Sequence, residues 1–144
     1  MYNIIIAKMT DIPMMISTLI FIIPLYSHFQ HGELFECIMI CAVIITSLLS
    51  DSICYTGKYA KLVNTIDRIV APLTLFVILR RSFIIHSILI HRMYICCAVL
   101  CGLFCLYKAR NAPNLSLQYR IYHILWHLTL VSTNVLITFN RPNY

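Results

Sequence analysis

Residues 119–138 read YRIYHILWHLTLVSTNVLIT and indicate a membrane-spanning helix. A helix that crosses a bilayer needs about 20 mostly apolar residues, and this segment meets that length. It also carries His123 and His127, which lie four residues apart and therefore on one helix face, one turn from each other. Ionisable side chains inside a membrane are costly, so the first interpretation of such a pair is a functional site.

The composition extends the membrane interpretation to the whole chain. Of its 144 residues, 60% are hydrophobic and 11% are charged, and the mean hydropathy is +0.83. Soluble domains carry about 25% charged residues. We therefore expect an all-α, multi-pass transmembrane helical bundle that forms a single integral membrane domain over residues 1–144. Lysine and arginine outnumber aspartate and glutamate by 11 to 5. This excess fits loops that face anionic lipid. The sequence contains no stripe of basic residues, so nucleic-acid binding is not indicated.

Five spans are predicted, at residues 12–29, 34–54, 62–79, 93–107 and 119–139. Residues 82–90 are apolar but too short to span, so we expect them to lie in the interface. If they instead form part of a further span, the chain has six. Pro24 is expected to kink the first span, because proline has no N–H to donate within a helix.

The distribution of positive charge favours five spans. With a cytosolic N-terminus, five spans place more lysine and arginine inside than outside, whereas six spans give equal shares. The sequence predicts a multi-pass protein with a cytosolic N-terminus and does not indicate an organelle. Asn114-Leu-Ser116 is a glycosylation sequon that is usable only if its loop is lumenal, so it reports on topology.

Polar residues gather at the ends of three predicted spans. Ser47, Ser50 and Asp51 end the second span, Asp67 begins the third, and the histidine pair begins the last. Five spans bring these ends to one side of the membrane, and six spans separate the histidines from Asp67. Two imidazoles, a third ligand and a water describe an open catalytic zinc site. Asp67 would orient a ligand or take a proton. Ser47 would donate a hydrogen bond to an oxyanion.

This arrangement resembles the CREST superfamily, which includes the alkaline ceramidases and the progestin/adipoQ receptors. Residues 122–128, YHILWHL, are similar to the final-helix motif of that family, with a tryptophan just before the second histidine. The resemblance implies a zinc ion and the hydrolysis of a lipid amide or ester. His123 and His127 match two of the family's zinc ligands, Asp67 matches its aspartate and Ser47 matches its serine.

The chain departs from the family pattern in the second span. The family places its third ligand, a histidine, four residues after the serine, as S-x3-H. In this chain that position after Ser47 is Asp51, and the corresponding position after Ser50 is Cys54. Asp51 is therefore the expected third ligand, with Cys54 as the alternative. Family members typically have seven helices, two more than predicted here.

Each of these residues also has a structural interpretation. The histidines would be interfacial groups hydrogen-bonded to other helices, and Asp67 would be stabilised by the dipole at a helix start. Asp51 would be a solvated residue at a helix end, and Ser47 would bond to its own helix backbone. The alternative function is a non-enzymatic structural or assembly membrane protein, such as a complex subunit or a viral membrane component. Membrane lipids are the expected partners, and the oligomeric state and any partner subunits stay open.

Overall fold

The structure is a computed structural model that describes residues 11–53, 59–85, 89–113 and 116–139. The regular elements of this part are all helices: α2 (Ile12–Leu19), α3 (Ile22–Gln30), α4 (Leu34–Leu48), the π-helix η1 (Leu49–Ile53), α5 (Ala60–Ile85), α6 (Leu89–Asn111) and α7 (Leu117–Phe139). When α2 and α3 are taken together as one span, these elements supply five helices that are long and apolar enough to cross a membrane. Helices suit this environment because they satisfy their own backbone hydrogen bonds. The all-α class with five spanning helices is confirmed.

The first span is broken in the middle. Asp11 caps its start, since the Asp11 carboxylate accepts a hydrogen bond from the Met14 N–H at 3.4 Å. The helix is then interrupted at residues 20–21, between α2 and α3. Pro24 explains the break, because it has no N–H for the Ile20 carbonyl four residues earlier and its ring clashes with that carbonyl.

The described part of residues 82–90 does not form a segment of its own. α5 continues to Ile85 and α6 already begins at Leu89. His91 and Arg92 therefore lie in the first turn of α6, where long polar side chains can reach the polar interface while their stems stay apolar. The fourth span is accordingly longer than the predicted 93–107.

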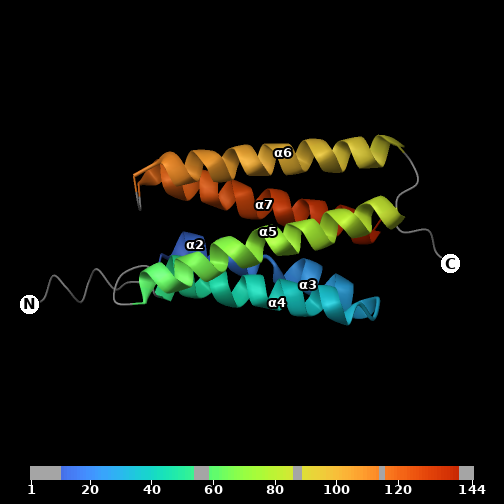
Figure 1. Cartoon of the computed structure of the whole chain (residues 1–144), viewed down its shortest axis with the longest axis horizontal. Helices are drawn as coiled ribbons and strands as arrows, with labels where there is room; N and C mark the ends of the chain where they lie inside the picture. The colour runs from blue at the N-terminus through green and yellow to red at the C-terminus, as the bar shows by residue number, and fades with distance from the viewer. Residues whose placement is uncertain (1–10, 54–58, 86–88, 114–115, 140–144) are drawn as a thin grey trace, which may run out of the picture.

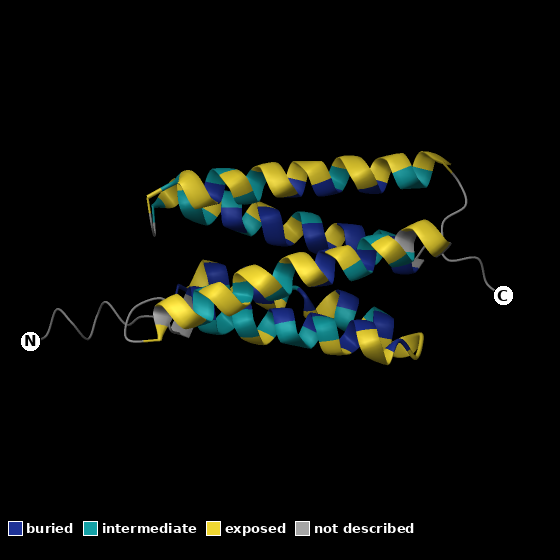
Figure 2. Cartoon of the chain, in the orientation of Figure 1, coloured by how far each residue is buried: buried dark blue, intermediate teal, exposed yellow. Residues whose placement is uncertain are grey.

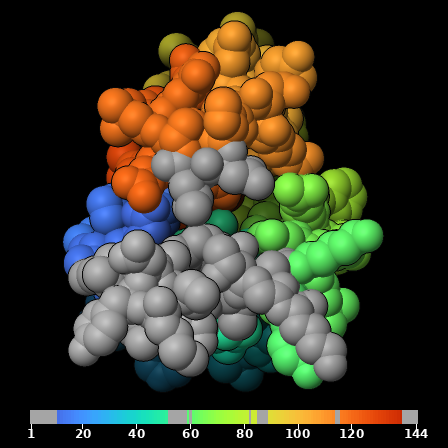
Figure 3. Space-filling model, turned by 90° about the vertical axis from the view of Figure 1, so that its left-hand side faces the viewer, coloured from blue at the N-terminus to red at the C-terminus, as the bar shows by residue number. Residues whose placement is uncertain are grey.

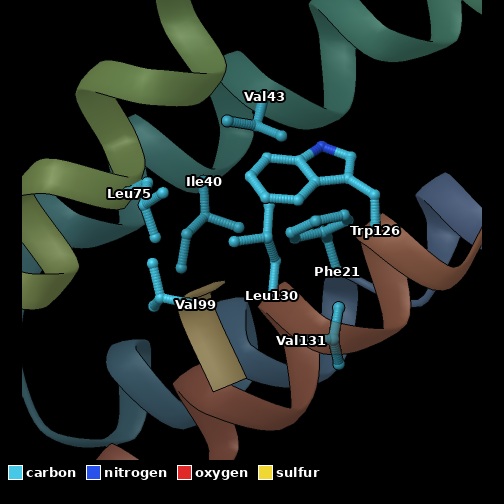
Figure 4. Close-up of a cluster of buried hydrophobic side chains, with 8 residues drawn as sticks. All are labelled: Phe21, Ile40, Val43, Leu75, Val99, Trp126, Leu130 and Val131. Carbon is cyan, nitrogen blue, oxygen red and sulfur yellow. The ribbon is translucent and has the colours of Figure 1, made fainter. Parts of the chain in front are cut away.

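The helices pack into one bundle with α7 near its centre (Figure 1). α7 packs against α6, α2 and α3, and α4 packs against α5 and α3. Figure 4 shows the core that joins them, made of Phe21, Ile40, Val43, Leu75, Val99, Trp126, Leu130 and Val131. Gly102 lets α6 approach α7 closely, because a Cβ at this position would lie 3.1 Å from the Trp126 ring.

Large apolar side chains cover the outward faces of the bundle, as the exposed residues along α5 and α6 in Figure 2 illustrate. Phe76 is 66% exposed and Leu100 is 65% exposed. Soluble monomers rarely expose apolar patches of this extent, whereas a lipid environment solvates them. The protein is a multi-pass helical membrane protein. The cytosolic N-terminus stays a prediction.

Candidate metal centre

One end of the bundle gathers the polar residues singled out from the sequence. Because consecutive spans run in opposite directions, α2, α5 and α7 begin at the same end at which η1 and α6 finish (Figure 1). Figure 3 faces this end. A partly open cavity of about 270 Å³ lies here, and all five predicted site residues line it: Ser47, Asp51, Asp67, His123 and His127.

Local structure determines which side chains point into this cavity. α7 starts after Ser116, whose hydroxyl accepts a hydrogen bond from the Tyr119 N–H at 3.1 Å, so the histidines fall in its second and third turns. The last turn of the second span is the π-helix η1, a rare geometry that frequently occurs at functional sites. It holds Asp51 inside the bundle, at 6% exposure. The interpretation of Asp51 as a solvated residue is therefore wrong.

Asp51, His123 and His127 form a group that can hold a metal ion. Each offers one ligand atom, and these atoms lie within 4.8 Å of one another. All three residues are buried. Ligands of one tetrahedral zinc ion lie about 3.4 Å apart, given Zn–N and Zn–O bonds of ~2.1 Å.

Two atoms of this group lack a hydrogen-bond partner. Asp51 Oδ2 and His123 Nε2 are 3.0 Å apart, close enough for electrostatic attraction. Both are fully buried, and neither makes a hydrogen bond. Among the described residues, the two atoms therefore have only each other as a polar partner. A carboxylate and an imidazole are both common zinc ligands, so the donor set and its geometry fit a metal ion.

A serine from the first span determines which nitrogen of His127 can bind a metal. The Ser17 hydroxyl donates its one hydrogen to the Met14 carbonyl at 2.8 Å. Ser17 Oγ also lies 3.0 Å from His127 Nδ1. With the Ser17 hydrogen directed to the Met14 carbonyl, Nδ1–H of His127 is the donor to Ser17 Oγ. The other ring nitrogen, Nε2, then carries the lone pair that a metal needs.

Asp67 lies against the second span instead of solvent. Its Oδ1 atom accepts hydrogen bonds from Ser47 Oγ at 2.7 Å and from Thr46 Oγ1 at 3.2 Å. The interpretation of Ser47 as bonded to its own helix backbone is therefore wrong. The Ser47 hydrogen is directed to Asp67 and not toward an oxyanion in the cavity. In this arrangement Ser47 orients the carboxylate of Asp67.

Several residues near the site were not identified from the sequence. Ser17 is one of them, and the only signal that could have found it is a hydroxyl in an otherwise apolar span. Asp11 and Arg120 form an ion pair at 2.6 Å that fastens the first span to α7. Cys54, the alternative third ligand, lies outside the described residues.

A second polar cluster lies at the opposite end of the bundle and was not predicted from the sequence. His28 Nδ1 lies 2.5 Å from Glu33 Oε2, and His28 Nε2 lies 3.3 Å from the side-chain oxygen of Asn134. Arg81 forms ion pairs with both Glu33 and Glu36. We call these five residues the far cluster. None of them lines the cavity.

Comparisons of the chain with protein-family models, with curated proteins and with solved structures found no match. The function is therefore argued from the geometry of the site.

Proposed function

We propose that the protein is a zinc-dependent hydrolase of the membrane that acts on a lipid amide or ester. The observation that carries the proposal is the meeting of Asp51, His123 and His127 with the Asp67–Ser47 pair around one cavity. A metal-ligand group alone would be compatible with a structural ion. A second carboxylate beside it, in a cavity that a substrate can enter, favours catalysis.

The ligand set supports a catalytic rather than a structural zinc ion. Structural zinc sites are closed by four protein ligands, whereas catalytic sites use three, commonly histidines with a carboxylate, and leave one position open. Asp51, His123 and His127 are three such ligands. When bound, zinc supplies Lewis-acid chemistry, which acidifies water and polarises a carbonyl group.

Asp67 is the residue we assign to proton transfer. Hydrolysis adds water across the C–N or C–O bond and releases a carboxylic acid together with an amine or an alcohol. Asp67 takes a proton from the attacking water and returns it to the leaving group, as a positioned carboxylate can. Ser47 and Thr46 hold this carboxylate at the cavity wall. Their hydroxyl groups act as positioning groups for Asp67.

The surroundings of the site support a lipid substrate. Phe21, Val43, Pro72, Trp126 and Leu130 form apolar parts of the cavity wall. The serine, the aspartate and the H-x3-H pair by which the sequence resembles the CREST superfamily all line this cavity. Members of that family are associated with hydrolysis of lipid amides, which agrees with the chemistry proposed here.

The test is a hydrolysis assay on the zinc-loaded, detergent-purified protein with a panel of lipid amides and esters. Asp67→Asn should keep its zinc and lose about 100-fold or more in rate, because general acid–base catalysis contributes 10²–10⁴-fold. Arg80→Ala, which changes an exposed side chain at the other end of the bundle, should retain the rate. An inactive zinc-loaded wild type, or an active Asp67→Asn protein, would contradict the proposal and favour a non-enzymatic membrane protein.

A further inference from the structure

Two arginines line the cavity and have no role in the chemistry proposed above. Arg68 belongs to α5 and Arg110 belongs to the last turns of α6. Both side chains are exposed, which places them at the mouth of the cavity. Neither forms an ion pair with another residue in the described part of the chain.

The carboxylates of the cavity are engaged elsewhere. Asp51 lies against His123, and Asp67 accepts hydrogen bonds from Ser47 and Thr46. Asp51 is buried and Asp67 is half-buried, so Arg68 and Arg110 are the exposed charged groups among the residues that line the cavity. Guanidinium groups bind phosphate and carboxylate through paired, charge-assisted hydrogen bonds.

The mouth lies where a lipid can reach it from the bilayer. α5 packs chiefly on α4, α6 packs chiefly on α7, and the two helices touch each other only sparsely. The cavity wall nevertheless includes Ala71 and Pro72 from α5 and Leu106 from α6. Both helices thus contribute apolar residues to the cavity wall, and each also carries one of the two arginines.

We propose that the ligand of this cavity is an anionic amphiphile, whose phosphate binds Arg68 and Arg110 and whose hydrocarbon chain extends between α5 and α6. This inference rests on the proposed function and specifies the substrate class of the same site. The negatively charged headgroup is held at the mouth, and the apolar chain passes the wall that contains Trp126.

Trp126 provides a direct readout, because it is the one tryptophan of the chain and lines the cavity. The full-length protein in neutral detergent is titrated with phosphatidic acid that carries brominated acyl chains, and quenching of tryptophan fluorescence is followed. Brominated phosphatidylcholine is the neutral comparison. We expect phosphatidic acid to quench at concentrations about tenfold lower or more, since hydrogen bonds to charged groups favour binding by at least that factor.

The arginines are tested with a charge-matched control. Arg68→Ala/Arg110→Ala should abolish the preference for phosphatidic acid, and Arg68→Lys/Arg110→Lys should retain part of it. Lys61→Ala/Lys108→Ala removes two positive charges from the same two helices at residues that do not line the cavity. This control should keep the preference. Equal quenching by both lipids, or an equal loss in the lysine and arginine double variants, would overturn the proposal.

Two further measurements distinguish a failure of the lipid proposal from a failure of the zinc proposal. Inorganic phosphate should not displace the brominated lipid, and displacement at similar concentrations would overturn the assignment to a lipid. The titration is run on metal-free and on zinc-loaded protein, and the preference should appear in both. The zinc content of the same samples tests the metal site independently, so failure of the lipid preference and failure of the zinc site are distinguishable.

Discussion

The two ends of the bundle hold similar side chains but use them differently. Each end combines histidine with carboxylates inside the membrane protein. In the far cluster the charges meet partners: Arg81 pairs with Glu33 and Glu36, and His28 lies between Glu33 and Asn134. At the metal centre, Asp51 and His123 lie 3.0 Å apart and line a cavity together with His127, with no arginine or lysine of the described residues paired to the carboxylate.

The difference separates a structural role from a functional one. Buried charges that are paired fasten the elements that carry them, and removing one partner is strongly destabilising. At the metal centre the carboxylate and the two histidines instead line a cavity that a ligand can occupy. We infer that the far cluster holds α3, α4, α5 and α7 together and that the metal centre is kept for binding. Substitutions at one end should therefore leave the other end unaffected.

The largest expected effect is on stability, from Arg81→Ala. This change leaves Glu33 and Glu36 buried without their cation, so the free energy of unfolding should fall by about 3 kcal/mol. Denaturant titration in mixed micelles measures it. Zinc binding at the other end should be unchanged. Arg80→Ala is the control, since Arg80 is exposed and makes no ion pair with a described residue. Equal destabilisation by both changes would contradict a structural role for the far cluster.

Asp51→Asn should give the opposite pattern. The amide keeps the size of the side chain but is a poor metal ligand, so zinc affinity should fall by about 100-fold or more, beyond the usual effect of groups that only support a ligand. The unfolding free energy of the metal-free protein should fall by less than in Arg81→Ala, because the amide oxygen can still accept a hydrogen bond from Ser50 and only the contact with His123 is weakened. Isothermal titration with zinc and denaturant titration measure the two quantities. A large loss of metal-free stability would assign Asp51 a structural role.

Ser17→Ala should have the smallest effect of the three. Without the Ser17 hydroxyl, His127 is no longer held in the tautomer that offers Nε2, and zinc affinity should fall by about tenfold. Thr18→Val is the control, because Thr18 Oγ1 bonds to the same Met14 carbonyl but not to a histidine. If both variants bind zinc alike, Ser17 does not orient His127.

The features that could be predicted from the sequence are those carried by local pattern. Long apolar runs predicted the five helices, and the alternating directions of these helices predicted that Asp67 and His123 lie at the same end of the bundle. The end of α5 and the start of α6 could not be located in this way. His91 and Arg92 separate the apolar residues 82–90 from the apolar residues 93–107, but α6 accommodates both polar side chains in its first turn.

The remaining parts of the site depend on packing between distant segments. Ser17 meets His127 across 110 residues of sequence, and Glu33 meets Arg81 across 48. No local pattern reports such pairs. The π-helix η1 packs against α2 and α5, which are distant in the sequence or on another span, so the burial of Asp51 could not be inferred from its position at a helix end. The break in the first span could be predicted from the sequence, because Pro24 disrupts the hydrogen bonding of the helix that contains it.

The most direct test of the metal centre is the zinc content of the detergent-purified protein, measured by elemental analysis. The wild type should contain about one zinc ion per chain, as a single three-ligand site implies. His123→Ala/His127→Ala should contain none, and His31→Ala, which removes an exposed imidazole at the other end, should match the wild type. A folded wild type without zinc, or equal zinc in the double variant, would contradict a metal centre at Asp51, His123 and His127.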